Sequence, residues 1–224
     1  MSSHVHAGAA VVDLTKFMCP TDARNLARLP RMQDIYDALA RIARAHAPRT
    51  VCEIGVRAGY SAYVWMTESP NAKVYLGIDM DDQARYGGPW LWHARKLLDT
   101  LDVEWTIWEK DTQKMRALPE HRVYPEQSAL HVGGDVVSPD ISVYRNLFDL
   151  IHVDGDHTYE GCMHDMKMCW PTVAPGGVMV VDDATYLPGP VRAVREFTGT
   201  VIGAERIYLE QSPTGSMVFV KEGA

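Results

Sequence analysis

The sequence predicts an α/β domain built on a doubly wound, mostly parallel sheet of seven strands, with an antiparallel hairpin strand at its C-terminal end. Two observations carry this prediction. Short apolar segments alternate with segments of helical periodicity along most of the chain, which is typical of a parallel sheet covered by helices on both faces. The last two apolar segments are separated by only a short turn, which predicts a closing hairpin.

The first half of the chain supplies three strands. Apolar residues recur at helical spacing over 31–46, and Pro48 ends that helix. The strand 50–54 is partly β-branched and bounded by glycine, and the helix 60–68 that follows ends at Pro70. A second apolar strand, 74–78, leads to a helix over 90–101, whose entry is set by a Gly-Gly-Pro turn, and then to the strand 103–108.

The stretch 112–147 interrupts the alternation, because it contains prolines, a glycine pair and no clean period. We expect a short helix and a long surface excursion there; the alternative is that 129–132 forms the third strand and 103–108 an additional one. Regularity returns with the strand 148–153, the helix 161–170, the strand 178–181 and the helix 190–197, which has Pro190 at its first position. The strands 206–209 and 216–220, joined by a turn at 212–215, form the predicted hairpin.

We expect an N-terminal arm or lid over 1–30 and a single domain over 31–224.

Composition limits the classes of partner. The 22 Lys and Arg residues against 29 Asp and Glu give a formal charge of −7, which argues against nucleic acid, since phosphate binding relies on clustered basic residues. No apolar run approaches the roughly 20 residues of a membrane span, so we expect no membrane partner. Four cysteines without a CxxC pair favour reduced, mostly buried thiols and a cytoplasmic location.

Acidic residues and glycines follow the first two strands. Glu53 precedes a loop with Gly55 and Gly59, a spacing that allows a ligand to approach the backbone and the start of the next helix. The loop lacks the GxGxxG pattern of dinucleotide sites, and an acid at this place suits a cationic or hydroxyl-bearing ligand. Asp79 follows the second strand, where it can accept hydrogen bonds from two ribose hydroxyls. Together these residues predict a nucleoside ligand.

Three carboxylates follow two strands that should be neighbours in the sheet. Asp154 ends one strand, and Asp182 with Asp183 ends the next. Such a cluster would repel itself unless a cation is bound, and oxygen ligands suit Mg²⁺, Mn²⁺ or Ca²⁺; the alternative is a simple turn and a helix N-cap. His157 is close enough to face the same cavity and to act as a base, whereas we expect His152, inside the strand, to be a satisfied core residue.

The segments FDLIHVDGDHTYEG, at 148–161, and PGGVMVVDD, at 175–183, resemble the class I S-adenosylmethionine-dependent methyltransferases, and more narrowly the metal-dependent macrocin-type O-methyltransferases. The resemblance covers about 50–197 and implies a Rossmann-like methyltransferase fold. It also implies a role for each matching residue: Glu53, Gly55 and Gly59 cradle the methionine part of the cofactor, Ser61 adds a hydroxyl, Asp79 holds the ribose, Asp111 lies beside the adenine, Asp154, Asp182 and Asp183 bind the metal, and His157 with Asp154 forms the catalytic pair.

The predicted function is therefore metal-dependent O-methylation of a small-molecule hydroxyl, on a sugar or other natural-product scaffold with vicinal oxygens. S-adenosylmethionine and a divalent metal, with Mg²⁺ favoured, are the expected cofactors. We expect Tyr86, Trp90, Trp92 and Tyr186 either to wall the acceptor pocket or to be ordinary packing residues. The alternatives are a metal-independent N- or carboxyl-methyltransferase, a nicotinamide-dependent oxidoreductase, or a binding protein without turnover. A homo-oligomer is left open.

Overall fold

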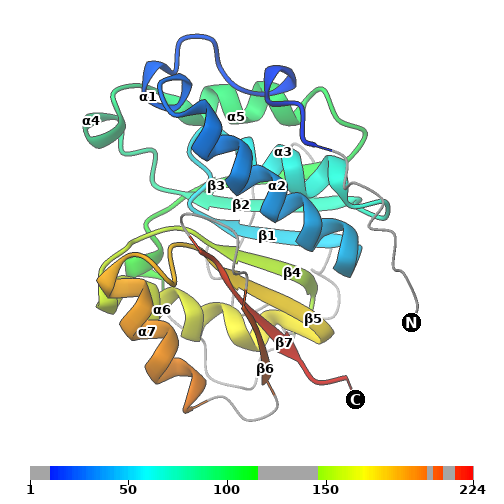
Figure 1. Ribbon diagram of the computed structural model, residues 1–224, viewed down its shortest axis with the longest axis vertical. Coiled ribbons are helices and arrows are strands. Elements are labelled where there is room, and N and C mark those ends of the chain that lie inside the picture. Colours follow the sequence, from blue (N-terminus) through cyan, green and yellow to red (C-terminus); the bar gives the residue numbers. More distant parts are fainter. Residues whose placement is uncertain (1–10, 116–145, 201–203, 209–214, 224) are drawn as a thin grey trace, which may run out of the picture.

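A computed structural model describes residues 11–115, 146–200, 204–208 and 215–223 of the chain (Figure 1). The strands β1 to β7 span, in order, Thr50–Ile54, Val74–Asp79, Glu104–Glu109, Phe148–Val153, Val173–Val181, Ala204–Tyr208 and Met217–Lys221. The helices α1 to α7 span Ala23–Leu26, Leu29–His46, Tyr60–Glu68, Gln83–Tyr86, Trp90–Leu98, Tyr159–Cys169 and Pro188–Thr198. Short 3₁₀ helices lie at Leu14–Lys16 (η1), Thr112–Lys114 (η2) and Trp170–Thr172 (η4).

The strands form one seven-stranded sheet in the order β3-β2-β1-β4-β5-β7-β6. The five strands from β3 to β5 run parallel, and β7 is antiparallel to both β5 and β6. This topology confirms the predicted doubly wound sheet with its closing hairpin. The chain winds outward in opposite directions from β1 and β4, so the switch point, where ligands bind in such sheets, lies between these two strands.

Helices cover both faces of the sheet (Figure 1). The helices α2, α3 and α5 pack on one face, where they share a buried cluster with Val51, Leu150 and Val180. The helices α6 and α7 cover the other face, in a cluster that includes Cys52 and Ile151. Successive residues of a strand point to opposite faces, so each central strand contributes alternate residues to both clusters. Burial of both faces explains why these strands are apolar throughout.

Most predicted elements lie where the sequence placed them. The bounds of β1, α3 and β4 are as predicted, and β3 pairs with β2 as the third strand. The alternative strand at 129–132 lies outside the described residues, as do most of the 112–147 stretch and most of the turn at 212–215.

Several other boundaries differ from the prediction: α2, β2, β3, α6, β6 and β7 by one or two residues at an end, and three further elements as follows. The helix α7 begins at Pro188 rather than Pro190; both prolines fit, because the first N–H groups of a helix have no partner within it. The strand β5 begins at Val173 rather than at Val178, so Pro175, Gly176 and Gly177 lie within it, and Gly176 has a φ of +79°. The helix α5 ends at Leu98, three residues earlier than expected.

The N-terminal arm packs against the helices of the first face. Phe17 stacks on Tyr63 with ring centroids 5.1 Å apart. Asp22, which is 1% exposed, accepts a hydrogen bond from the Tyr60 hydroxyl at 3.1 Å and forms an ion pair with Arg57 at 3.2 Å. The arm therefore contacts the loop that follows β1 as well as the helical layer. Whether it acts as a lid stays a prediction.

Two further expectations concern the whole chain. All four cysteines lie in described residues and are free thiols, and three of them are buried, as predicted. Among the helices of the described ranges, none combines the length and apolarity needed to cross a membrane. The cytoplasmic location and a homo-oligomer stay predictions.

Candidate active site

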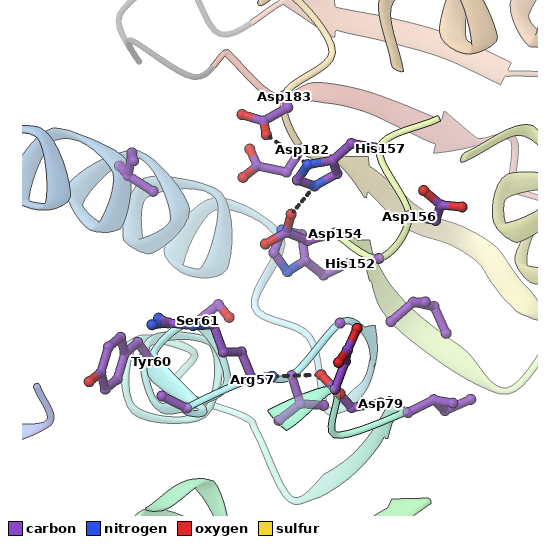
Figure 2. Close-up of a pocket in the computed structure, with 18 of the residues that line it drawn as sticks. Arg57, Tyr60, Ser61, Asp79, His152, Asp154, Asp156, His157, Asp182 and Asp183 are labelled. Carbon is purple, nitrogen blue, oxygen red and sulfur yellow. Dashed lines mark hydrogen bonds and ion pairs between the residues drawn. The ribbon is translucent and has the colours of Figure 1, made fainter. Parts of the chain in front are cut away.

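A cavity of about 810 Å³ lies at the carboxyl ends of the central parallel strands, and residues of α1 and α2 form another of its walls (Figure 2). Its volume lies in the upper part of the range usual for ligand pockets, roughly 300–1,000 Å³, which leaves room for two small ligands. Eight of the ten predicted site residues line it: Gly55, Ser61, Asp79, Asp111, Asp154, His157, Asp182 and Asp183. In the part of the chain that the structure describes, Glu53 and Gly59 do not line it.

The loop after β1 approaches the chain after β4 closely. Gly55 has a φ of +90°, and a Cβ atom at this position would lie 2.0 Å from the backbone oxygen of Asp154. Only glycine fits such a contact. Gly59 also has a positive φ, of +77°, but its Cβ would meet Ala94 on α5. Gly59 therefore permits close packing of helices, whereas Gly55 shapes the cavity wall.

Asp79 lies at the end of β2 and faces the same cavity. One carboxylate oxygen accepts a hydrogen bond from the Arg57 backbone N–H at 2.8 Å, and the other accepts from the Asp81 N–H at 2.7 Å. These bonds fix the carboxylate, and each of its oxygens retains a further acceptor site. Asp79 can thus accept hydrogen bonds from a vicinal diol.

Ser61 and Asp111 line the cavity on either side of this carboxylate. Ser61 is the second residue of α3, where backbone N–H groups are unpaired within the helix. Asp111 follows β3 and caps η2, accepting from the Gln113 N–H at 3.1 Å and pairing with Lys114 at 2.9 Å. The hydrogen bond to Lys114 holds the pKa of Asp111 below its usual value.

The sequence predicted that Glu53 faces the ligand, but in the structure Glu53 does not line the cavity. Its side chain is 0% exposed, and its carboxylate accepts hydrogen bonds from the Tyr75 hydroxyl at 2.5 Å and pairs with His152 Nδ1 at 2.7 Å. The carboxylate therefore lies beneath the cavity floor and acts through the groups that it holds.

The predicted acidic cluster is assembled across β4 and β5. The N–H groups of Asp154 and Asp182 donate to carbonyls of the neighbouring strands at 2.8 and 2.9 Å, which extends the sheet by one residue and fixes both positions. Asp182 also accepts a hydrogen bond from the Ser216 hydroxyl at 2.7 Å. Asp183 has a φ of +53°, a left-handed conformation that turns the chain sharply at the edge of the cavity.

His157 lies between two of these carboxylates (Figure 2). Its Nε2 is 3.0 Å from Asp154 Oδ1, and its Nδ1 is 3.5 Å from Asp183 Oδ2. The hydrogen bond to Asp154 raises the pKa of His157 to about 8. Burial raises the pKa of Asp154, and burial with the nearby carboxylates raises that of Asp183 to about 6. The cluster thus carries more negative charge than its surroundings balance, and it attracts cations.

His152 was expected to be a satisfied core residue, and the structure corrects this. It is 1% exposed but lines the cavity floor, and among the described residues its Nε2 has no hydrogen-bond partner. Burial lowers its pKa, but the hydrogen bond to Glu53 and the charges of nearby carboxylates outweigh this effect and raise the pKa of His152 to about 9. The sequence held one signal, because a residue two positions before Asp154 on a strand points to the same face.

The wall contributed by the N-terminal segments was not predicted. It combines apolar or aromatic residues of α2 with basic residues around the start of that helix: Met32, Ile35, Tyr36, Leu39, Arg24, Arg28 and Arg31. Four aromatic residues were expected to wall an acceptor pocket or to be packing residues. Of these, Tyr186 lines this cavity, whereas Trp90 and Trp92 are absent from its described lining. The side chain of Tyr86 lies outside what the structure describes.

Comparisons with known proteins identify the family and the fold of the chain. A family model described as a methyltransferase domain matches residues 52–184, which is more than half of the chain, so the chain belongs to this family. With this fold it is a class I S-adenosylmethionine-dependent methyltransferase, as the sequence predicted. Among curated protein sequences no significant match is found.

Solved structures match over nearly the full chain at low identity. The methyltransferase PaMTH1 of Podospora anserina, bound to S-adenosylhomocysteine, has a TM-score of 0.60 at 13% identity, covering 97% of this chain and 91% of that one. The O-methyltransferase TomG of Streptomyces achromogenes, bound to S-adenosylmethionine, has a TM-score of 0.58 at 16% identity, with coverages of 96% and 92%. An O-methyltransferase of Bacillus cereus, in complex with S-adenosylhomocysteine, gives 0.52 at 16%, with coverages of 93% and 95%. At these identities the likeness establishes the fold.

Proposed function

We propose that the protein transfers a methyl group from S-adenosylmethionine to a hydroxyl of a small molecule with vicinal oxygens, in a reaction that requires a divalent cation. The observation that carries this proposal is that a histidine and three carboxylates share one cavity with Asp79, a carboxylate that can accept hydrogen bonds from a diol. The O-methyltransferases among the structural neighbours support the choice of oxygen as the acceptor atom.

One side of the cavity suits the cofactor. Asp79 would bind the two ribose hydroxyls, since its oxygens are already oriented by backbone N–H groups. Gly55 would let the methionine part approach the backbone, and Ser61 would add a hydroxyl at the start of α3. Asp111 lies after β3, on the side where the adenine would lie. Glu53, which lies beneath the cavity floor, would not touch the cofactor.

The other side suits a hard cation. Asp154, Asp182 and Asp183 offer carboxylate oxygens, the donors that Mg²⁺ and Mn²⁺ prefer. The raised pKa of Asp183, caused by burial and by the neighbouring carboxylates, indicates unbalanced negative charge that a cation would relieve. When bound, S-adenosylmethionine supplies an electrophilic methyl group and the cation lowers the pKa of a nearby hydroxyl.

His157 would accept the proton that the acceptor hydroxyl loses. Its ring is oriented by Asp154 and Asp183, and a pKa near 8 lies close to the working pH, as effective general bases require. Asp154 would thus serve both the cation and the orientation of the base. The α2 wall and Tyr186 would exclude water and hold the acceptor in line with the methyl group. The acceptor class, a sugar or other natural-product scaffold, rests on the sequence resemblance.

The test is formation of S-adenosylhomocysteine by purified protein supplied with S-adenosylmethionine, Mg²⁺ or Mn²⁺, and catechol or a deoxysugar as acceptor. We expect turnover that a chelator abolishes and that added metal restores. His157→Gln should lower turnover by roughly 10²–10⁴-fold with little change in cofactor affinity. The matched control is His164→Gln, because His164 bonds to the Thr112 carbonyl outside the cluster.

The outcomes separate the alternative functions. Turnover that is unaffected by chelator would exclude a requirement for metal and favour N- or carboxyl-methylation. Binding of NADH in place of S-adenosylmethionine would favour an oxidoreductase. Cofactor binding without methyl release to any acceptor would favour a binding protein.

A further inference from the structure

The floor of the cavity holds a buried histidine that the proposed reaction does not use. His152 lies on β4 two residues before Asp154, and it pairs in register with Val180, two residues before Asp182. Because residues two apart on a strand share a face, all three polar side chains point to the α3 side of the sheet. Figure 2 shows His152 beside Asp154, with Asp182 beyond.

The ring of His152 is held in one orientation. Its Nδ1 is 2.7 Å from Glu53 Oε1, and its edge packs against Trp65, with ring centroids 5.3 Å apart. Glu53 is itself fixed by the Tyr75 hydroxyl at 2.5 Å. This hydroxyl can reach Glu53 because Gly77, opposite Glu53 in the β1–β2 register, has no side chain; a Cβ there would lie 3.1 Å from the Tyr75 oxygen.

This orientation leaves Nε2 as the ring nitrogen that can give up its proton to solvent and bind a cation in its place. It is buried and makes no hydrogen bond with any residue that the structure describes, although buried polar atoms nearly always have a partner or an ion. His152, Asp154 and Asp182 each offer a ligand atom, and these atoms lie within 4.8 Å of one another. A second such group, Asp154, His157 and Asp183, shares Asp154.

Given the metal-dependent function proposed above, on which this inference rests, we propose that His152 Nε2 is a ligand of the divalent cation, beside Asp154 and Asp182. Histidine ligands commonly bond through their other ring nitrogen to a carboxylate, which sets the tautomer and the ring orientation, and Glu53 has this position. Glu53 and Tyr75 are then positioning residues. One nitrogen among oxygen donors favours Mn²⁺, Fe²⁺ or Co²⁺ over Mg²⁺, because imidazole is a poor ligand for Mg²⁺.

The test is pulsed electron paramagnetic resonance of Mn²⁺ bound to the whole protein, prepared with natural-abundance and with ¹⁵N-labelled histidine. We expect a nitrogen coupling that changes with the label. It should persist in His157→Gln and in the control His164→Gln, and disappear in His152→Gln. A coupling that disappears in His157→Gln but persists in His152→Gln would overturn the assignment, as would bound Mn²⁺ without any nitrogen coupling.

A second variant covers the case in which His152→Gln does not fold. Glu53→Gln leaves the imidazole in place but loosens its orientation, and loss of such an outer partner typically weakens metal binding about 10–100-fold. Titration of free Mn²⁺ by electron paramagnetic resonance should show this loss, while His164→Gln binds like the wild type. Mn²⁺ affinity unchanged in Glu53→Gln would contradict the proposal.

The same measurements distinguish this inference from the proposed function. If Mn²⁺ binds and supports turnover without a nitrogen coupling, only the role of His152 is wrong. If the wild-type protein binds S-adenosylhomocysteine but no divalent cation, the metal-dependent function fails, and the role of His152 fails with it.

Discussion

Asp165, a buried carboxylate next to Gly155 in the loop after β4, gives a quantitative test of the electrostatics near the cavity. This residue of α6 is 0% exposed. Its Oδ1 accepts a hydrogen bond from Gln113 at 3.1 Å, while in the described part of the chain its Oδ2 has no partner. Burial raises the pKa of Asp165 from 3.8 to about 6. Because one pKa unit corresponds to about 1.36 kcal/mol, this rise in the pKa of Asp165 corresponds to about 3 kcal/mol.

The sign follows from proton linkage. The folded protein binds the Asp165 proton more tightly than the unfolded chain, so the folded state is not penalised below pH 3.8 and loses stability as the pH rises from 3.8 to about 6. Asp165→Asn removes this charge. At pH 7.5 we expect the free energy of unfolding of the variant to exceed that of the wild type by about 1–3 kcal/mol, so that the variant unfolds at a higher denaturant concentration. The gain is smaller than the full value because the new amide keeps part of the burial penalty.

The assay is urea unfolding at pH 4.5 and pH 7.5, monitored by tryptophan fluorescence. The advantage of Asp165→Asn should shrink at pH 4.5, whereas Asp102→Asn, at an exposed position, should change nothing at either pH. If Asp165→Asn destabilises the protein at pH 7.5 as much as at pH 4.5, the ionised carboxylate is well satisfied in the fold, and the reasoning is wrong.

Two other predictions concern the cofactor side of the cavity. Gly55→Ala should abolish S-adenosylhomocysteine binding in calorimetry, because the new Cβ would displace the Asp154 backbone. The control Gly176→Ala should bind normally, because Gly176 has a similar φ of +79° but open space around it among the described residues. Equal binding by the two variants would refute the importance of the Gly55 contact. Asp79→Asn should weaken that binding roughly 10–100-fold, since it replaces a charged acceptor of hydrogen bonds, and an unchanged Kd would exclude Asp79 from ribose binding.

The sequence predicted the edge of the sheet well, for a physical reason. In a parallel sheet, residues that follow the strands must meet at one edge, so Asp79, Asp154 and Asp182 could be brought together from strand order alone. The clustering with His157 followed because it lies three residues from Asp154 on the same loop. Local patterns were sufficient wherever the backbone determined the position.

Side-chain orientation within the sheet was harder to predict. Glu53 turns beneath the cavity because its partner His152 comes from a strand 99 residues away and because Gly77 leaves room for the Tyr75 hydroxyl. Neither contact has a local signature. The basic wall around Arg28 and Arg31 was missed for the same reason, since only the packing of the arm and α2 against the sheet brings these residues to the acidic edge.

The contact between Asp22 of the arm and the loop after β1 has a thermodynamic consequence. Asp22 bonds to both Arg57 and Tyr60, and the Arg57 backbone in turn holds Asp79. The loop after β1 therefore contacts both the arm and Asp79, so docking of the arm and binding of a ligand at Asp79 depend on the same loop conformation. If docking of the arm raises the affinity for the ligand by some factor, binding of the ligand raises the equilibrium constant for docking of the arm by the same factor. The docking of the described part of the arm, from residue 11 onward, and the binding of a ligand at Asp79 can therefore be linked through the loop that contains Arg57.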